Sequence, residues 1–332
     1  MGETMWRSIK IAFRSIRWGL GVAGALALIL TAMIAMPLQR PPELKSISET
    51  VGRVDRSTMP ALQRFSARDG TELAYRHYPA RATPVGKVAI LVHGSSGSSV
   101  AVHALADALA ARGVDTFAPD IRGHGGSGTR GDIGYLGQLE DDLGDLVAEV
   151  RKTAPALPIV LLGHSAGGGF ALRAASAPIQ DLFARTVLLS PYLGYDAPTN
   201  RENSGGWASP DVPRILALGV LARLGLPCCE ALPVLAFAVR PNSEKYVVST
   251  YSYRLLRNFA TSGYKADLSA AKHPVTIMAG ADDELMLADK YADAVHPVAP
   301  AVDVKLIAGV NHMEIVSAPQ AVSAIAEDVA TR

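Results

Sequence analysis

From about Leu62 onward, short apolar runs alternate with longer segments whose apolar residues recur at helical spacing. The first pattern predicts buried strands and the second predicts helices. The expected strands are residues 71–78, 87–92, 114–118, 159–162, 185–189, 275–279 and 302–307. The expected helices are residues 102–111, 138–151, 287–294 and 320–329, with one more directly after Ser165. Since strands buried on both faces are apolar throughout, this alternation predicts a mostly parallel sheet with helices on both faces.

The alternation stops between residue 191 and about residue 271. This segment contains several prolines and two apolar pieces, residues 215–224 and 232–239, which we expect to be helical. A connection of this length with helices of its own is not a simple loop. We therefore expect a helical cap insertion over the carboxyl edge of the sheet, where open α/β folds bind their ligands.

The amino-terminal segment differs in character from everything after it. Residues 18–36 are uncharged and mostly apolar, and at about 1.5 Å per residue a helix of this length approaches the hydrocarbon thickness of a membrane. The basic residues before it are Arg7, Lys10, Arg14 and Arg17. We expect a basic cytoplasmic amino terminus at 1–17 and a transmembrane anchor at 18–36. The catalytic domain would then lie on the opposite side, in the periplasm or outside the cell. A cleaved signal peptide is the alternative.

Residues 37–60 have no sustained hydrophobic period and are typical of a linker, so we expect the folded domain at 61–332. The chain has 332 residues and a net charge of +1, which gives no reason to expect a nucleic-acid partner. The two cysteines, Cys228 and Cys229, are adjacent and cannot join distant segments. We expect them to be small buried side chains, with a strained vicinal disulfide as the alternative.

The most specific chemistry lies in Gly163-His164-Ser165-Ala166-Gly167, which has the form G-x-S-x-G. An expected strand precedes it and a helix-forming run, residues 170–175, follows it. This strand–turn–helix setting raises the pattern above chance. Because the flanking glycines allow a sharp turn, we expect the hydroxyl of Ser165 to stand clear of the sheet edge as a nucleophile. The alternative is a structural turn serine.

Several motifs in the order of the chain resemble those of the α/β-hydrolase superfamily. They are Val92-His93-Gly94, the Asp-Ile-Arg-Gly-His-Gly-Gly-Ser run at 120–127, the turn at 163–167, Gly280-Ala281-Asp282-Asp283, and Asn311-His312. Within the superfamily, residues 62–330 are most similar to the branch of monoacylglycerol lipases and lysophospholipase-like serine hydrolases. That branch often has methionine after the nucleophile, where this chain has Ala166. The resemblance implies the α/β-hydrolase fold with a cap.

A serine hydroxyl needs a base to take its proton, and the base needs an acid that orients it. In this fold the chain order is serine, acid and histidine. His312 follows the last expected strand through a short loop, so we expect it to be the base. Acidic residues occupy 282–284, after the preceding strand. The family pattern Gly-x-x-Asp favours Asp283 as the acid, with Asp282 as the alternative.

Acyl transfer also needs hydrogen-bond donors for the oxyanion. In this fold one donor is the backbone N–H after the nucleophile, here Ala166. The second comes from the loop after the His93 strand, where we expect the N–H of Ser95, with Ser96 as the alternative. Both donors are backbone N–H groups, so substituting the side chains of Ser95 and Ala166 would reveal little about them.

The other histidines have less specific settings. We expect the side chain of His164 to point away from the nucleophile, His93 to shape its loop and His124 to be structural. The remaining histidines have no motif around them, and surface or core positions are expected: His77, His103, His273 and His296.

Together these features predict a membrane-anchored serine hydrolase that cleaves lipid-like or other hydrophobic carboxylic esters through an acyl-enzyme. No cofactor or metal is expected. Two alternatives stay open: a peptidase or amidase on the same fold, and a catalytically silent binding domain. A serine at the nucleophile position argues against haloalkane dehalogenase and epoxide hydrolase chemistry, which on this fold uses aspartate there.

Overall fold

The computed structural model describes residues 2–226, 228–243, 247–261 and 263–332. Among these residues the central element is an eight-stranded sheet with the order β1-β2-β4-β3-β5-β6-β10-β11. Its strands are β1 Gln63–Ser66, β2 Glu72–Tyr78, β3 Val88–Val92, β4 Asp115–Pro119, β5 Ile159–His164, β6 Arg185–Leu189, β10 Val275–Gly280 and β11 Asp303–Ile307. Pairing is antiparallel at β1–β2 and β2–β4 and parallel from β4 to β11. The mostly parallel sheet predicted from the sequence is therefore confirmed.

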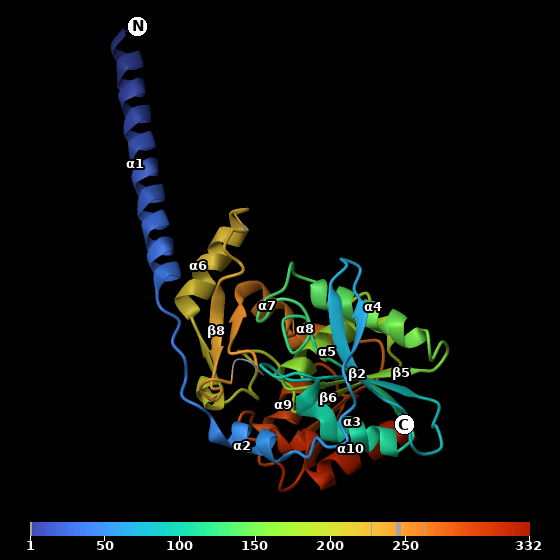
Figure 1. Ribbon diagram of the computed structural model, residues 1–332. Coiled ribbons are helices and arrows are strands. Elements are labelled where there is room, and N and C mark those ends of the chain that lie inside the picture. Colours follow the sequence, from blue (N-terminus) through green and yellow to red (C-terminus); the bar gives the residue numbers. More distant parts are fainter. Residues whose placement is uncertain (1, 227, 244–246, 262) are drawn as a thin grey trace.

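Helices cover both faces of this sheet (Figure 1). They are α3 His103–Ala111, α4 Gln138–Arg151, α5 Ala166–Ser176, α8 Tyr264–Ala270, α9 Tyr291–Val295 and α10 Pro319–Thr331. The side chains of α3 and α10 share one hydrophobic cluster, and those of α4, α5, α8 and α9 share another. In β3, Ile90 belongs to one cluster and its neighbour Leu91 to the other. Alternating side chains are thus buried on both faces, which is why this strand is continuously apolar in sequence.

The segment between β6 and β10 forms a cap of mixed structure. It contains α6 Val212–Arg223, α7 Tyr253–Asn258 and a three-stranded sheet of β7 Ala208–Pro210, β8 Pro233–Phe237 and β9 Thr250–Ser252. The helix expected at 215–224 is present as α6. The helix expected at 232–239 is wrong, because this piece is β8, paired antiparallel with β7 and β9. Short apolar runs fit a strand or a helix equally well, and here pairing partners decide.

Cys228 and Cys229 lie between α6 and β8. Both are exposed free thiols, so the expectation of a buried pair is wrong. They lie in a turn whose backbone reaches a positive φ of 72° at Cys229. This turn lies at the surface, so both side chains are exposed to solvent.

The amino terminus forms one long helix, α1 Gly2–Ala35, which projects away from the rest of the molecule (Figure 1). Among the described residues, α1 is the one helix long and apolar enough to cross a membrane. It begins well before residue 18, so the basic segment expected to be separate continues the same helix. Near its end α1 packs against α6, where Arg214 Nε donates to the carbonyl of Ile34 at 3.0 Å.

The segment expected to be a linker also contains a helix, α2 Lys45–Arg53. Ile47 and Val51, one helical turn apart, both face the protein interior, and Ile47 is buried. Two apolar residues in nine positions are too short a signal for periodicity to detect. The tertiary contacts of α2 therefore determine its structure.

Candidate active site

Ser165 lies in the sharp turn between β5 and α5. Its backbone has φ 55° and ψ −120°, a conformation that a non-glycine residue rarely adopts. A side chain at Gly163 would overlap the carbonyl oxygen of Gly167, and one at Gly167 would overlap that of His93. The sharp strand–turn–helix geometry expected from the sequence is present, with backbone strain at Ser165, and both flanking glycines are sterically required.

Ser165 and His312 line the same cavity, which has a volume of about 470 Å³. Ser165 is largely buried, with 6% of its surface exposed. Its hydroxyl forms no hydrogen bond within the described part of the chain, including to His312. Hydrogen bonds at catalytic sites often tighten only when substrate is bound, so this geometry is compatible with a nucleophile and base.

His312 and Asp283 form a buried pair. His312 Nδ1 lies 2.8 Å from Asp283 Oδ2, and the other carboxylate oxygen accepts the N–H groups of Leu285 and Met286, each at 2.8 Å. Burial alone raises the pKa of Asp283, but the charge of His312 and these hydrogen bonds lower it below its ordinary value. The carboxylate is thus ionised and accepts the Nδ1 proton. This tautomer leaves Nε2 of His312 as the basic nitrogen.

Of the two carboxylates considered from the sequence, Asp283 is the one that contacts His312, while Asp282 is exposed. Glu284, for which the sequence predicts no role, accepts the backbone N–H of His312 through Oε2 at 2.9 Å. Arg201 also donates to the carbonyl oxygen of Asp283, at 3.0 Å from Nη2. These contacts fix the loops that carry the pair. No motif reveals them, because they join segments far apart in sequence.

The expected oxyanion donors, the backbone N–H groups of Ser95 and Ala166, differ in their hydrogen bonding from the alternative donor, the N–H of Ser96. The N–H of Ser96 donates to the hydroxyl of Tyr251 at 2.9 Å, so it is already engaged. The backbone N–H of Ser95 has no acceptor within the described residues. The side-chain Oγ of Ser95 accepts a hydrogen bond from Trp207 Nε1 at 2.9 Å. Ala166 is the first residue of α5, where backbone N–H groups lack acceptors inside the helix. Ser95 and Ala166 remain the predicted donors.

The expectation for His164 is wrong. Its side chain lines the cavity beside Ser165, with its ring centroid 4.9 Å from that of His312. His164 Nε2 donates to the carbonyl of His312 at 3.0 Å, while Nδ1 is buried without a partner. Burial and the nearby His312 lower the pKa of His164 to about 3, so it is neutral at pH 7. Sequence could not show this contact, because it depends on how the loop of His312 packs across β5.

His93 and His124 hold loops together, as expected. The N–H of Ile121 donates to His93 Nε2 at 3.1 Å, which connects the two glycine-rich loops. His124 Nε2 lies 2.6 Å from the hydroxyl of Tyr251 in β9. Burial lowers the pKa of both histidines below the ordinary value. Both are therefore neutral structural groups.

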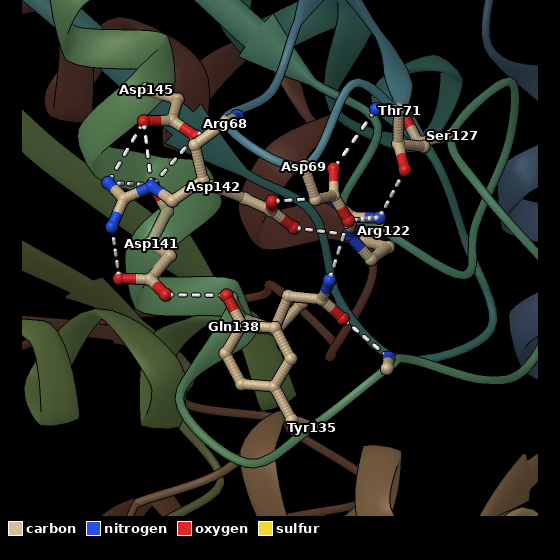
Figure 2. Close-up of polar contacts among 12 residues, drawn as sticks. Arg68, Asp69, Thr71, Arg122, Ser127, Tyr135, Gln138, Asp141, Asp142 and Asp145 are labelled. Atoms are coloured by element: carbon tan, nitrogen blue, oxygen red, sulfur yellow. Dashed lines mark hydrogen bonds and ion pairs between the residues drawn. The ribbon is translucent and has the colours of Figure 1, made fainter.

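A second polar cluster surrounds Arg122 (Figure 2). Arg122 donates to both carboxylate oxygens of Asp142, each at 2.7 Å, and to the hydroxyl of Thr71 at 2.9 Å. It also pairs with Asp69 at 3.0 Å. Although burial opposes it, these carboxylates raise the pKa of Arg122 above its ordinary value. We call Arg122, Asp142, Asp69 and Thr71 the Arg122 cluster; it ties the loop after β4 to α4 and to the β1–β2 hairpin.

No group of three or more His, Cys, Asp or Glu side chains within the described ranges is arranged to hold a metal ion. The candidate reacting groups described above are Ser165, His312 and Asp283 and the backbone N–H groups near them.

Comparison with known proteins gives matches of several kinds. The family model Hydrolase_4, described as serine aminopeptidase, S33, matches residues 83–316. The monoacylglycerol lipase of Mycolicibacterium smegmatis is 34% identical over 106 residues, which cover 32% of this chain and 38% of that protein. Human monoglyceride lipase is 38% identical over 128 residues, which cover 38% and 41% of the two chains. These matches span less than half of the length of either relative.

Solved structures of low sequence identity share the fold. A soluble variant of monoglyceride lipase from Saccharomyces cerevisiae superposes with a TM-score of 0.62 at 18% identity, over 83% of this chain and 94% of that one. A membrane phospholipase A superposes with a TM-score of 0.55 at 14% identity, over 96% of each chain. Since the family model matches well over half of the sequence, the chain belongs to the S33 family of α/β hydrolases.

Proposed function

We propose that this protein is a membrane-anchored serine hydrolase that cleaves carboxylic esters with lipid-like or other hydrophobic acyl groups. The observation that carries the proposal is the shared cavity: a strained, unbonded serine and a buried His312–Asp283 pair line or adjoin one largely apolar space. This combination of nucleophile, base and orienting acid is the one that acyl transfer requires.

The reaction would proceed in two steps. His312 Nε2 takes the proton of Ser165 as the hydroxyl oxygen attacks the ester carbonyl, and Asp283 stabilises the imidazolium that forms. The N–H groups of Ser95 and Ala166 hold the tetrahedral oxyanion. The carbon–oxygen bond to the leaving alcohol breaks as His312 protonates it, which gives the acyl-enzyme. His312 then deprotonates a water molecule, whose attack releases the acid and restores Ser165.

The walls of the cavity favour a hydrophobic ester over a peptide. They include Val100, Ala101, Val247, Leu285 and Met313. Among the described residues that line the cavity there is no Asp or Glu, although an aminopeptidase would need a carboxylate for the amino group of its substrate. The similarity to monoacylglycerol and monoglyceride lipases supports the same preference. Amide hydrolysis is the second candidate, motivated by the description of the family.

The length and apolar surface of α1 support the membrane anchor. Basic residues precede its most apolar part, so we place the amino terminus in the cytoplasm and the catalytic domain across the membrane, in the periplasm or outside the cell. A signal sequence would satisfy the same pattern, and the apparent mass of the mature protein in membrane fractions separates the two.

Labelling with a fluorophosphonate probe tests the proposed nucleophile. Wild-type protein in detergent should label, Ser165→Ala should not, and Ser269→Ala, on the exposed surface of α8, should label like the wild type. Matched ester and amide substrates with the same acyl group should then show faster ester cleavage. Absence of labelling in folded wild-type protein would overturn the proposed function, and faster amide cleavage would favour the second candidate.

A further inference from the structure

One wall of the cavity is formed by a segment outside the matched hydrolase family. The family match begins at residue 83, whereas α2 spans Lys45–Arg53. Four residues of this helix line the cavity: Ile47, Ser48, Val51 and Gly52. The segment between the apolar helix α1 and the hydrolase domain therefore contributes to the site itself.

The amino-terminal end of α2 is fixed to the cap. The backbone N–H of Leu44 donates to the carbonyl of Ala238 at 2.9 Å, and Glu43 pairs with Arg240 at 3.3 Å. Ile47 is only 6% exposed and belongs to the main hydrophobic cluster of the domain. Since Ala238 and Arg240 also line the cavity, α2 and the cap form this wall together.

The carboxyl-terminal end of α2 is capped by Arg56. Its guanidinium donates to the carbonyl oxygens of Val51 and Val54, which are acceptors near the end of the helix. A positive charge at this end also interacts favourably with the helix dipole. Together with the contacts at Leu44, this cap holds α2 at both ends, so the helix presents a defined surface to the cavity.

The two faces of α2 have different chemistry. Ile47 and Val51, four residues apart, place branched apolar side chains on the cavity side. On the outer side, Glu49 and Arg53 form an exposed ion pair at 3.7 Å. Other walls of the cavity bring Val100 and Val239. Polar residues of α2 and its surroundings, Ser48, Arg56 and Arg240, line the cavity as well. Hydrocarbon is the ligand chemistry that the apolar side chains accept, since burying it against them removes apolar surface from water.

We propose that α2 forms part of the subsite for the acyl chain and sets the length and bulk of the acyl groups that the enzyme accepts. This inference rests on the proposed ester hydrolase function. It also gives α2 a position that connects anchor and site. The chain leaves α1 at Ala35, continues through residues 36–44, and reaches the cavity wall in the first turn of α2, at Ile47. An acyl chain bound against Val51 lies between the membrane-proximal segment and Ser165.

Substitution of Val51 tests the inference in the full-length protein in detergent. With p-nitrophenyl esters from butyrate to dodecanoate, Val51→Trp should lower kcat/KM for dodecanoate about tenfold or more relative to butyrate, because the indole fills space that a long chain needs. Val51→Ala should shift the same ratio toward longer chains. Ser46→Trp, on the exposed side of the same helix, is the matched control and should leave the ratio within about twofold of wild type.

The outcomes separate the two proposals. An unchanged chain-length ratio in both Val51 variants, in protein that still labels with fluorophosphonate, would overturn the role of α2 and leave the ester hydrolase intact. An equal shift in Ser46→Trp would also overturn it, since the effect would then come from helix distortion. Absence of labelling and of ester cleavage in the wild type would instead overturn the proposed function.

Discussion

Two polar clusters in this protein, the Arg122 cluster and the candidate active site, differ in how completely their atoms are paired. In the Arg122 cluster, the guanidinium of Arg122 forms hydrogen bonds or ion pairs with each of the other three side chains (Figure 2). At the candidate active site, by contrast, His164 Nδ1 is buried without a partner. Ser165 lines the cavity, and its hydroxyl forms no hydrogen bond to any of the described residues. A buried polar group left unpaired costs stability. The Arg122 cluster avoids this cost, whereas the candidate active site bears it at His164 and also holds Ser165 in a strained backbone conformation.

The comparison shows that two motifs of one sequence have separate physical roles. The loop at 120–127 is held by charge pairing that spans α4 and the β1–β2 hairpin, and it carries no reacting group. The turn at 163–167 holds a strained serine against a cavity. Substitutions in the first cluster should therefore affect the free energy of unfolding, and substitutions in the second should affect the reaction rate.

Ser165→Ala should give the largest effect. We expect kcat for a short-chain ester to fall about 10⁶-fold, as for removal of the nucleophile in a serine hydrolase. The melting temperature should stay the same or rise slightly, because the lost hydroxyl forms no hydrogen bond in the folded chain. Calorimetry and ester hydrolysis on the same preparation check both halves. A large drop in melting temperature would mean that Ser165 stabilises the fold as the Arg122 cluster does, and the proposed difference between the two clusters would then be wrong.

Asp283→Asn should lower kcat about 10⁴-fold. The amide keeps the shape of the carboxylate but cannot stabilise the imidazolium, and it favours the wrong tautomer of His312. Asp282→Asn, on the neighbouring exposed residue, is the matched control and should keep nearly full activity. If Asp282→Asn were the more damaging substitution, the acid would be Asp282 and the buried pair with His312 would be structural.

Arg122→Ala should lower the free energy of unfolding by about 3–5 kcal/mol, because it leaves the carboxylate of Asp142 buried and unpaired. The rate per active site, counted by fluorophosphonate labelling, should stay close to that of the wild type. Arg68→Ala is the matched control: Arg68 pairs with Asp141 and Asp145, but its side chain is 51% exposed, so we expect a loss of no more than about 1 kcal/mol. If Arg122→Ala and Arg68→Ala lowered the free energy of unfolding equally, the burial of Arg122 would not make its ion pairs more stabilising than the exposed pairs of Arg68.

The sequence predicts most of the sheet because its strands are buried on both faces and therefore continuously apolar, as Ile90 and Leu91 of β3 illustrate. It also predicts the turn of Ser165, since the flanking glycines are required by local backbone geometry. Asp283 and His312 were placed by their loops after successive strands, and the structure brings them together. These features depend on local pattern or on the edge at which parallel strands end.

The features that were missed depend on contacts between distant segments. β8 could be assigned only from its pairing with β7 and β9. α2 becomes recognisable only once Ile47 meets the core and Leu44 bonds to the cap. His164 contacts the loop of His312 through a hydrogen bond between residues 148 positions apart. No pattern within a window of ten or fifteen residues contains this information.

Asp69→Asn should give the smallest effect. The pH dependence of its free energy of unfolding tests whether Arg122 holds the carboxylate of Asp69 in its ionised form. Although burial opposes ionisation, the N–H and hydroxyl of Thr71 and the guanidinium of Arg122 lower the pKa of Asp69 to about 2. The unfolded value is about 3.9. A lowered folded pKa stabilises the fold above the unfolded pKa, and this contribution is lost as pH falls toward the folded pKa.

The free energy of unfolding of the wild type should therefore exceed that of Asp69→Asn by a constant amount above about pH 5, and the difference should shrink below about pH 4. Because the side chain of Asp69 is 34% exposed, screening should keep the pH-dependent part below about 1 kcal/mol. Urea unfolding across this range measures it. Ser165→Ala, which removes no charge, should follow the wild type at every pH. A difference for Asp69→Asn that stayed constant down to about pH 3 would mean that Arg122 does not hold this carboxylate in its ionised form.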